Sequence, residues 1–262
     1  MITLTTDFGL SDSYVAVMKG VILGIAPETL IVDVSHDIAP QDVDEAAYVL
    51  RTAYRYFPAT AIHVAVVDPG VGTQRKAVAI LTSHGIFVGP DNGIFCSVLV
   101  DQGALDEKSG RLVHGTAVHL TNEEYWRKPV SQTFHGRDIF APVAAHLARG
   151  VPLEALGAGI SQLHADSSAP ASTRGEAIYG RIVHIDRFGN AVSNVPADML
   201  PAACRIEIGG KVLEGLAASY QDARVVALVG SAGLLEVAAR NASAAETLGI
   251  RRGDPVVVRI RV

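Results

Sequence analysis

The chain has 262 residues, of which 49% are hydrophobic, so it can bury the core of one large domain or of two smaller ones. Its net charge of −5 and its lack of any Lys/Arg run argue against nucleic acid or an anionic membrane as the main partner and favour a small molecule. Cys96 and Cys204 indicate neither a disulfide framework nor a zinc site, and without a signal peptide or an apolar run of the about 20 residues that span a bilayer, we expect a cytoplasmic protein.

Strands and helices alternate in the first part of the chain. Strands are expected at 2–6, 30–34 and 61–67, and helices at 14–26 and after Pro40. This alternation predicts a parallel sheet with right-handed crossovers, in which all three strands end at one edge. Asp7, His36 and Asp68 lie at or just beyond these strand ends, so we expect them to converge there.

A glycine-rich loop follows the third strand. The apolar run stops at Asp68, continues as Pro69-Gly70-Val71-Gly72 and ends at the cations Arg75 and Lys76. Ligands of open parallel sheets bind just beyond the carboxyl ends of the strands, and glycine lets the backbone approach a ligand closely. The alternative is an ordinary surface turn, because Asp-Pro-Gly is common turn chemistry.

The rest of the first half predicts a hairpin, a short helix and a longer amphipathic helix. The hairpin turns at 83–85, and turn-forming residues at 89–93 open the short helix that runs to Val100. The stretch from there to Pro129 has no informative pattern. The longer helix follows 134–138 and is closed by Gly150, so that His135 lies just before it, where a side chain can point into a cleft.

The composition shifts towards Ser, Ala, Asp and Pro at 161–174, as in a linker. Beyond it, short strand candidates separated by turns predict a small antiparallel sheet or barrel. These candidates are 177–185, 205–208, 211–213, 225–229, 234–238 and 255–262. We therefore expect an α/β N-terminal domain with a central, largely parallel sheet (1–163), a linker (164–175) and a C-terminal antiparallel β-barrel domain (176–262).

Several ordered motifs together identify a family. They are Thr6-Asp7-Phe8-Gly9-x-x-Asp12, Asp33-x-x-His36, Val67-Asp68-Pro69-Gly70-Val71-Gly72, Gly89-Pro90-Asp91-Asn92-Gly93, Phe134-His135-Gly136-Arg137-Asp138, Ile185-Asp186-x-Phe188-Gly189-Asn190 and Ser231-x-Gly233. Over essentially its whole length the chain resembles the S-adenosyl-L-methionine (SAM) hydroxide adenosyltransferases, which are hydrolase relatives of the SAM-dependent fluorinase and chlorinase. The resemblance implies an α/β domain, a β-barrel domain, and a homotrimer with the substrate site at the subunit interface.

The resemblance implies hydrolysis of SAM to adenosine and L-methionine by attack of water or hydroxide at the ribose C5′. SAM is then the substrate, and neither a cofactor nor a metal is implied. Asp68, Arg75 and His135 match the catalytic trio that positions and activates water in this family, whereas halogenases carry a tyrosine where Asp68 stands. A carboxylate would repel a halide, while water needs an acceptor for its proton.

The resemblance also implies substrate contacts in both halves of the chain. A carboxylate at Asp7 suits vicinal ribose hydroxyls, and aromatic rings at Phe188 and Tyr220 suit the adenine face. Asp12 and Ser13 match contacts to methionine but are equally able to cap the first helix, and Gln41 replaces a halogenase tryptophan and leaves that wall unassigned. The implied substrate-binding residues are Asp7, Asp12, Ser13, Asp186, Phe188, Asn190, Tyr220, Ser231 and Asn241.

Three other functions stay open at this point. One is a metal-dependent hydrolase with Asp7, His36 and Asp68 as ligands at the sheet edge, although HExxH spacing is absent. A second is a SAM-dependent chlorinase, which Asp68 disfavours. A third is a protein that binds SAM or adenosine without turnover, which would not need a water-activating trio.

Overall fold

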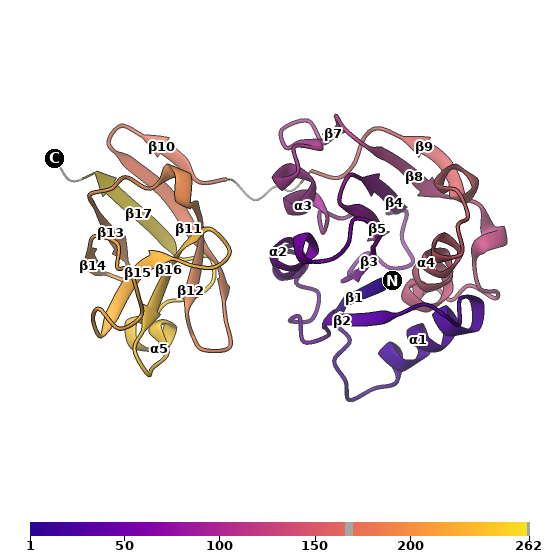
Figure 1. Ribbon diagram of the computed structural model, residues 1–262, viewed down its shortest axis with the longest axis horizontal. Coiled ribbons are helices and arrows are strands. Elements are labelled where there is room, and N and C mark those ends of the chain that lie inside the picture. The colour runs from indigo at the N-terminus through magenta and orange to yellow at the C-terminus, as the bar shows by residue number, and fades with distance from the viewer. Residues whose placement is uncertain (166–169, 261–262) are drawn as a thin grey trace. The chain divides into compact units, whose positions relative to one another are not determined.

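The computed structural model describes residues 1–165 and 170–260, and the chain divides into two compact units between residues 167 and 168 (Figure 1). Each unit has its own sheet and its own hydrophobic core. Part of the expected linker, 166–169, and the last two residues of the expected final strand lie outside the described residues. The remainder of the expected linker includes the short strand β10 (Ser172–Arg174).

Unit 1 is built on a seven-stranded sheet with the order β2-β1-β3-β5-β4-β8-β9. The pairs β2–β1, β1–β3 and β3–β5 are parallel, and β4, β8 and β9 extend the sheet in antiparallel pairs. The expectation of an α/β domain with a largely parallel central sheet is confirmed. The strands are β1 (Ile2–Thr6), β2 (Ile31–Ser35), β3 (Ile62–Val66), β4 (Ala77–Thr82), β5 (Gly85–Pro90), β8 (Thr116–Leu120) and β9 (Gly157–Ile160).

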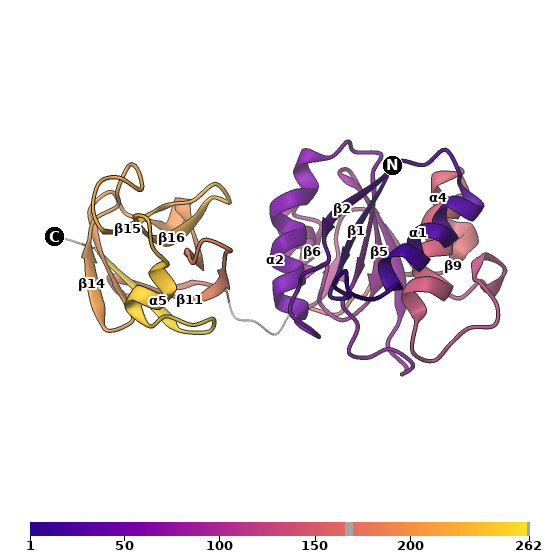
Figure 2. The ribbon, with the colours of Figure 1, turned by 90° about the horizontal axis from the view of Figure 1, so that it is seen from below.

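Helices cover both faces of this sheet. Figure 2 shows α2 (Val43–Ala53) on one side and α1 (Tyr14–Ile25) and α4 (Ala141–Ala148) on the other, and α3 (Cys96–Asp101) packs beside α2. Alternate residues of β3 serve the two layers, since Val64 packs with α1 and α4 while Ala65 packs with α2 and α3. A strand buried on both faces is therefore mostly apolar, with His63 as the exception in β3, which is why the pattern of β3 was readable in the sequence.

The region without an informative pattern forms several short elements. Among them is β8, a full strand of the sheet that the sequence did not reveal. The same region also contains β6 (Leu105–Asp106), β7 (Arg111–Leu112) and the short turn η2 (Glu123–Tyr125). Elsewhere in unit 1 lie the short turns η1 (Tyr54–Tyr56), η3 (Gly136–Phe140) and η4 (Leu153–Leu156). Within the two described ranges, no helix is both long and apolar enough to cross a membrane.

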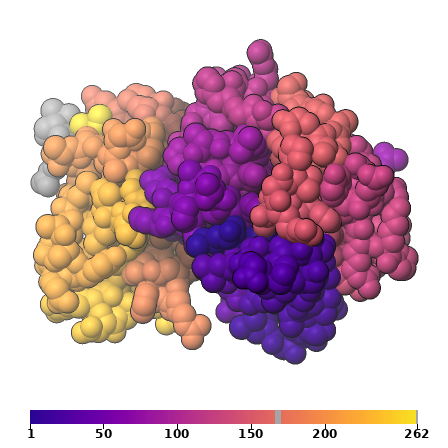
Figure 3. Space-filling view, turned by 45° about the vertical axis from the view of Figure 1, so that its right-hand side comes forward, coloured from indigo at the N-terminus to yellow at the C-terminus, as the bar shows by residue number. Residues whose placement is uncertain are grey.

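Unit 2, orange to yellow in Figure 3, is an antiparallel, barrel-like sheet with the order β14-β13-β17-β11-β12-β16-β15, and β10 pairs with β11. This confirms the expected antiparallel barrel, although β12 was not foreseen as a strand. The elements are β11 (Ala177–Ile185), β12 (Ala191–Pro196), η5 (Ala197–Met199), β13 (Cys204–Ile208), β14 (Lys211–Glu214), β15 (Val225–Val229), β16 (Leu234–Ala239), α5 (Ala244–Leu248) and β17 (Pro255–Ile260).

Candidate active site

The glycine loop after β3 packs against the segment that precedes His135. Gly72 has φ +76°, and a Cβ added there would lie 2.4 Å from the backbone oxygen of Gln132. Only glycine fits both that backbone conformation and that contact. The loop is closed on itself by hydrogen bonds from the Val71 amide to the Asp68 carbonyl oxygen (3.1 Å) and from the Thr73 amide to the Gly70 carbonyl oxygen (3.1 Å). Two segments far apart in the sequence are thereby placed in contact.

This contact brings Asp68, Arg75 and His135 into one hydrogen-bonded chain. Arg75 Nε donates to both Asp68 oxygens at 2.9 and 3.0 Å, and Arg75 Nη2 donates to Asp68 Oδ2 at 2.5 Å and to His135 Nδ1 at 2.7 Å. The side chains of Arg75 and Asp68 are only 10% and 6% exposed, and the guanidinium lies 5.3 Å from the Phe140 ring centroid. A largely desolvated guanidinium thus joins a carboxylate to an imidazole.

The protonation of His135 follows from this geometry. A guanidinium only donates hydrogen bonds, so Nδ1 of His135 is the acceptor, and the neutral ring carries its proton on Nε2. Burial lowers the pKa of His135, the nearby Arg75 charge lowers it further, and Asp68 and Asp138 act in the opposite direction. His135 therefore stays neutral at pH values just below the ordinary pKa of histidine. The three side chains thus combine a carboxylate, a guanidinium and an imidazole that carries an N–H on Nε2.

A π-helical turn, η3 (Gly136–Phe140), sets the position of His135. Its buried Asp138 accepts hydrogen bonds from Arg137 Nε (2.7 Å), from Arg137 Nη2 (2.8 Å) and from the amide of Ser131 (2.8 Å). Asp138 thus ties the loop before His135 to the turn after it. The sequence motif that contains Asp138 did not indicate this role. The available signal was an acid at the start of an otherwise apolar helix, and π turns often mark functional sites.

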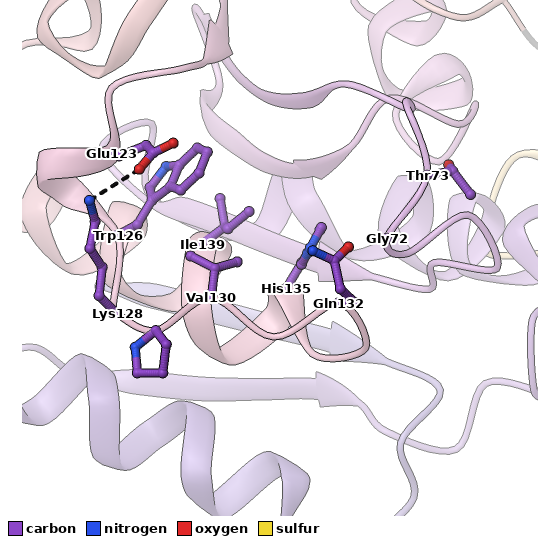
Figure 4. Close-up of a pocket in the computed structure, with 10 residues that line it drawn as sticks. Gly72, Thr73, Glu123, Trp126, Lys128, Val130, Gln132, His135 and Ile139 are labelled. Carbon is purple, nitrogen blue, oxygen red and sulfur yellow. Dashed lines mark hydrogen bonds and ion pairs between the residues drawn. The ribbon is translucent and has the colours of Figure 1, made fainter.

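A cavity of about 420 Å³ adjoins His135 within unit 1. Figure 4 shows His135 and Gln132 at one end, Trp126 and the Glu123–Lys128 ion pair at the other, and apolar side chains between them. The lining residues are Gly72, Thr73, Glu123, Trp126, Lys128, Pro129, Val130, Gln132, His135 and Ile139. The imidazole of His135 therefore both bonds to Arg75 and borders the cavity.

The other expected residues of unit 1 are engaged differently. Asp7 Oδ2 accepts a 2.8 Å hydrogen bond from the amide of Gln41, which has φ +66°, so this carboxylate holds a strained turn. Asp12 and Ser13 are exposed. Ser13 occupies the N-cap position of α1, but its side chain makes no capping hydrogen bond. The expected cap is therefore not made by Ser13.

The arrangement at the strand ends does not resemble a metal site. His36 Nδ1 is 2.8 Å from Thr6 Oγ1, and its Nε2 is 3.1 Å from an oxygen of Asp33. Asp68 is bound bidentately by Arg75. Over residues 1–165 and 170–260, no group of three or more His, Cys, Asp or Glu side chains is arranged to hold a metal ion. The ligand set expected for a metal-dependent hydrolase is thus not assembled.

In unit 2, Asp186 organises the turn between β11 and β12. Its Oδ1 accepts from the amides of Phe188 (2.9 Å) and Asn190 (2.8 Å), and its Oδ2 accepts from the Asn190 side-chain amide (2.8 Å). Gly189 has φ +81° and a Cβ there would meet Ser243 Oγ at 2.1 Å. The turn presents Phe188 with 79% of its surface exposed, which is unusual for so large an apolar ring.

Tyr220, Ser231 and Asn241 lie on loops of unit 2. The Tyr220 hydroxyl donates a 2.9 Å hydrogen bond to Glu236, a buried acid that sequence reasoning missed. Ser231 lies in the tight 230–234 turn, and Asn241 has φ +55° beside the bridge between Ala239 and Ala242. The signal for Glu236 was a carboxylate inside an otherwise apolar strand.

Comparisons with known proteins identify relatives over nearly the whole chain. The model of the SAM hydroxide adenosyltransferase N-terminal domain matches residues 2–157, and that of the C-terminal domain matches residues 180–257. A (R)-S-adenosyl-L-methionine hydrolase of Thermus thermophilus is 41% identical over 96% of this chain and 96% of its own length. The enzyme of the same name from Salinispora tropica is 38% identical over 100% and 97%.

A more distant relative and a solved structure also match the chain over nearly its whole length. A fluorinase of Nocardia brasiliensis is 26% identical over 99% of this chain and 97% of its own length. A crystal structure of an uncharacterized conserved protein from Thermotoga maritima superposes with a TM-score of 0.89 at 34% identity, covering 100% of both chains. With both domain models matched in order and hydrolases more similar than fluorinases, the chain belongs to the SAM hydroxide adenosyltransferase family.

Proposed function

We propose that this protein hydrolyses SAM to adenosine and L-methionine by attack of water at the ribose C5′. The observation that carries the proposal is the Asp68–Arg75–His135 chain, in which a largely buried carboxylate and guanidinium are joined to a neutral imidazole. Relatives named (R)-SAM hydrolase share 38–41% of the sequence over almost the whole length. The proposed trio falls within the part of the chain that matches the N-terminal family domain.

The proposed step forms a C–O bond and breaks a C–S bond. The water oxygen attacks C5′ while the electron pair of the C5′–S bond moves to sulfur, so the sulfonium leaves as the neutral thioether of methionine. The water loses one proton to the site. Opposite charges disappear as a hydroxide-like nucleophile meets a sulfonium, so a poorly hydrated pocket favours the transition state over the separated charges.

Each member of the trio has a distinct proposed role. His135 Nδ1 is occupied by Arg75, and its other nitrogen carries the proton, so the carboxylate of Asp68 is the remaining proton acceptor. Arg75 holds both carboxylate oxygens in place and stabilises the developing hydroxide. His135 Nε2–H donates a hydrogen bond to the water oxygen. Asp7 is proposed to accept from the ribose hydroxyls, as in the family.

The proposed substrate contacts come from both units. Asp7, Asp12, Ser13 and the trio belong to unit 1, whereas Asp186, Phe188, Asn190, Tyr220, Ser231 and Asn241 belong to unit 2. We infer a homotrimer in which the two sets meet between neighbouring subunits, as the family resemblance implies. Light scattering of the purified protein tests this assembly, and a monomer that is fully active would contradict it.

The test of the reaction is turnover of SAM in oxygen-18 water, with mass analysis of the nucleoside, in the presence and absence of chelator and at several chloride concentrations. Adenosine carrying the label at O5′, together with methionine and independent of chelator and chloride, is the expected result. A chlorinated nucleoside would instead support a halogenase, and activity lost to chelator would support a metal-dependent hydrolase. Saturable binding without any turnover would leave only a binding protein.

A further inference from the structure

Glu236 is a buried acid on β16, with 7% of its surface exposed. Alternate residues of this strand face opposite sides, and Leu235 and Val237 belong to the main core of unit 2. Glu236 lies on the other side with Ala238, directly opposite Leu228 of β15. Packing alone would favour an apolar residue there, because burying a carboxyl group costs free energy unless it is hydrogen-bonded.

The first contact of Glu236 is with Tyr220. The phenol hydroxyl donates to Glu236 Oε1 at 2.9 Å, across the face of β15 and β16. The loop that carries Tyr220 is braced separately by Asp222, which accepts hydrogen bonds from the amides of Ala218 (2.8 Å) and Ser219 (3.1 Å). The loop backbone is thus held by Asp222, while the orientation of the Tyr220 ring is held by Glu236.

The second contact of Glu236 is with the turn between β15 and β16. A Cβ added to Gly230 would lie 2.3 Å from Glu236 Oε2, so the acid packs directly on the backbone of this turn. The turn is closed by hydrogen bonds from the Gly230 amide to the Leu234 carbonyl oxygen (2.9 Å) and from the Gly233 amide to the Gly230 carbonyl oxygen (2.9 Å). Ser231 lies within it.

The electrostatic surroundings connect Glu236 to Asp186, another of the implied substrate-binding residues. Burial raises the pKa of Glu236; the hydrogen bond from Tyr220 acts to lower it, and the charge of Asp186 raises it further. The pKa of Tyr220 is likewise raised, first by burial and then by Glu236 and Asp186. Asp186, Tyr220 and Glu236 therefore form one local group, although they are separated in the sequence.

We propose that Glu236 is a positioning residue that holds the Tyr220 ring and the 230–234 turn in one arrangement. Tyr220 is expected to line the adenine face and Ser231 to contact the substrate, so Glu236 presents both contacts together. This inference rests on the proposed function. Glu236 does not touch the reacting atoms, and its effect is on the affinity for the nucleoside and the substrate.

The experiment compares Glu236→Leu, which has no hydrogen-bond acceptor, Tyr220→Phe, the double variant and Gly230→Ala with the wild-type protein. The matched control is Glu176→Gln, which removes an exposed carboxylate of the same unit. Steady-state kinetics with SAM give kcat and KM, and calorimetric titration with adenosine gives a Kd that requires no turnover. Thermal unfolding shows whether each variant is folded.

We expect Glu236→Leu and Tyr220→Phe each to raise the KM for SAM and the Kd for adenosine by roughly five- to tenfold, with kcat within about twofold. The double variant should be no weaker than the worse single variant, because the two residues act as one unit. Gly230→Ala should change KM and Kd in the same direction, since its methyl group displaces the Glu236 carboxyl. Glu176→Gln should match the wild type.

An unchanged KM and adenosine Kd in folded Glu236→Leu would overturn the inference, and so would a double variant whose loss is the product of the single losses. If Glu236→Leu does not fold, Tyr220→Phe decides, because it removes only the hydroxyl that Glu236 holds; an unchanged Kd then overturns the inference. Adenosine binding without SAM hydrolysis by the wild type would defeat the proposed function, while the Kd comparison would still test Glu236.

Discussion

The acids around the candidate trio of unit 1 and those beside the expected substrate contacts of unit 2 are held by different kinds of donor. In unit 1, Asp68 faces the guanidinium of Arg75 and Asp138 faces that of Arg137, so each buried negative charge is matched by a positive one. In unit 2, Asp186 is held by amide N–H groups and Glu236 by a phenol hydroxyl. In these four cases, arginine side chains hold the acids around the proposed catalytic trio, whereas neutral donors hold the acids that shape two turns of unit 2.

The largest expected effect separates these two kinds of carboxylate. Asp68→Asn removes the proton acceptor, so we expect kcat to fall by roughly 10²- to 10⁴-fold with KM within about threefold. Asp186→Asn should instead raise KM more than it lowers kcat, because it alters only the turn that presents Phe188 and Asn190. Single-turnover hydrolysis of SAM and steady-state KM measure the two effects.

The control for this pair is Asp198→Asn, an exposed acid of unit 2 that should leave both constants unchanged. Undiminished single-turnover hydrolysis by Asp68→Asn would remove Asp68 from the mechanism. A fall in kcat of equal size for Asp186→Asn would end the distinction between the two units.

The next effect tests whether the glycine loop positions the trio. Gly72→Ala introduces a methyl group 2.4 Å from the Gln132 oxygen at φ +76°, so either the loop or the His135 segment must move. We expect kcat to fall at least about tenfold and the free energy of unfolding to fall by more than about 1 kcal/mol. Gly103→Ala, also at positive φ but with open space around it, is the control for backbone strain alone. Equal kcat losses in the two variants would argue against the positioning role.

The pH dependence tests the charge state of the trio. The lowered pKa of His135 means that the ring stays neutral and bound to Arg75 below pH 6.5. Protonation of His135 would place an N–H on Nδ1, which now accepts a hydrogen bond from Arg75. Activity is therefore expected to be lost only as the pH falls through the lowered pKa of His135. The acid limb of kcat/KM should therefore lie below pH 6.5, and its position should change in His135→Gln, in which only the Asp68 carboxyl is left to titrate in the trio. A limb above pH 6.5 would contradict the assigned tautomer.

The smallest effect concerns stability and is confined to unit 1. Burial lowers the pKa of His63 from 6.5 to about 4, where the ring stacks on Phe87 at 5.0 Å and its Nδ1 lies 2.9 Å from Thr3 Oγ1. As the pH falls from 6.5 to 4, the unfolded chain binds a proton that the folded chain does not, so stability decreases by up to about 1.4 kcal/mol per pH unit from this residue. His63→Phe should remove that share of the slope in denaturant unfolding, and an unaltered slope would show that His63 is not buried as a neutral ring.

The strands and helices that position the trio were predictable, whereas several supporting elements were not. The mostly apolar β3 and the amphipathic helices carry strong local patterns, because burial on one or both faces favours apolar residues. In contrast, β8 and β12 gave no signal, since their pairing depends on partners distant in the chain. Ser13 stands at a helix cap without capping, because side-chain orientation is decided by the surroundings.

By itself, the sequence determined the fold class, the family and the residue types of the proposed trio, because these depend on local periodicity and on ordered motifs. Only the tertiary structure decided that Arg75 bridges Asp68 and His135, which nitrogen of His135 accepts, and that Asp138 and Glu236 act as supports. The physical reason is that hydrogen-bond partners and burial arise from contacts between segments, which no local pattern records. Arg75 and His135 are 60 residues apart in the sequence, and Glu236 is buried where β16 pairs with β15.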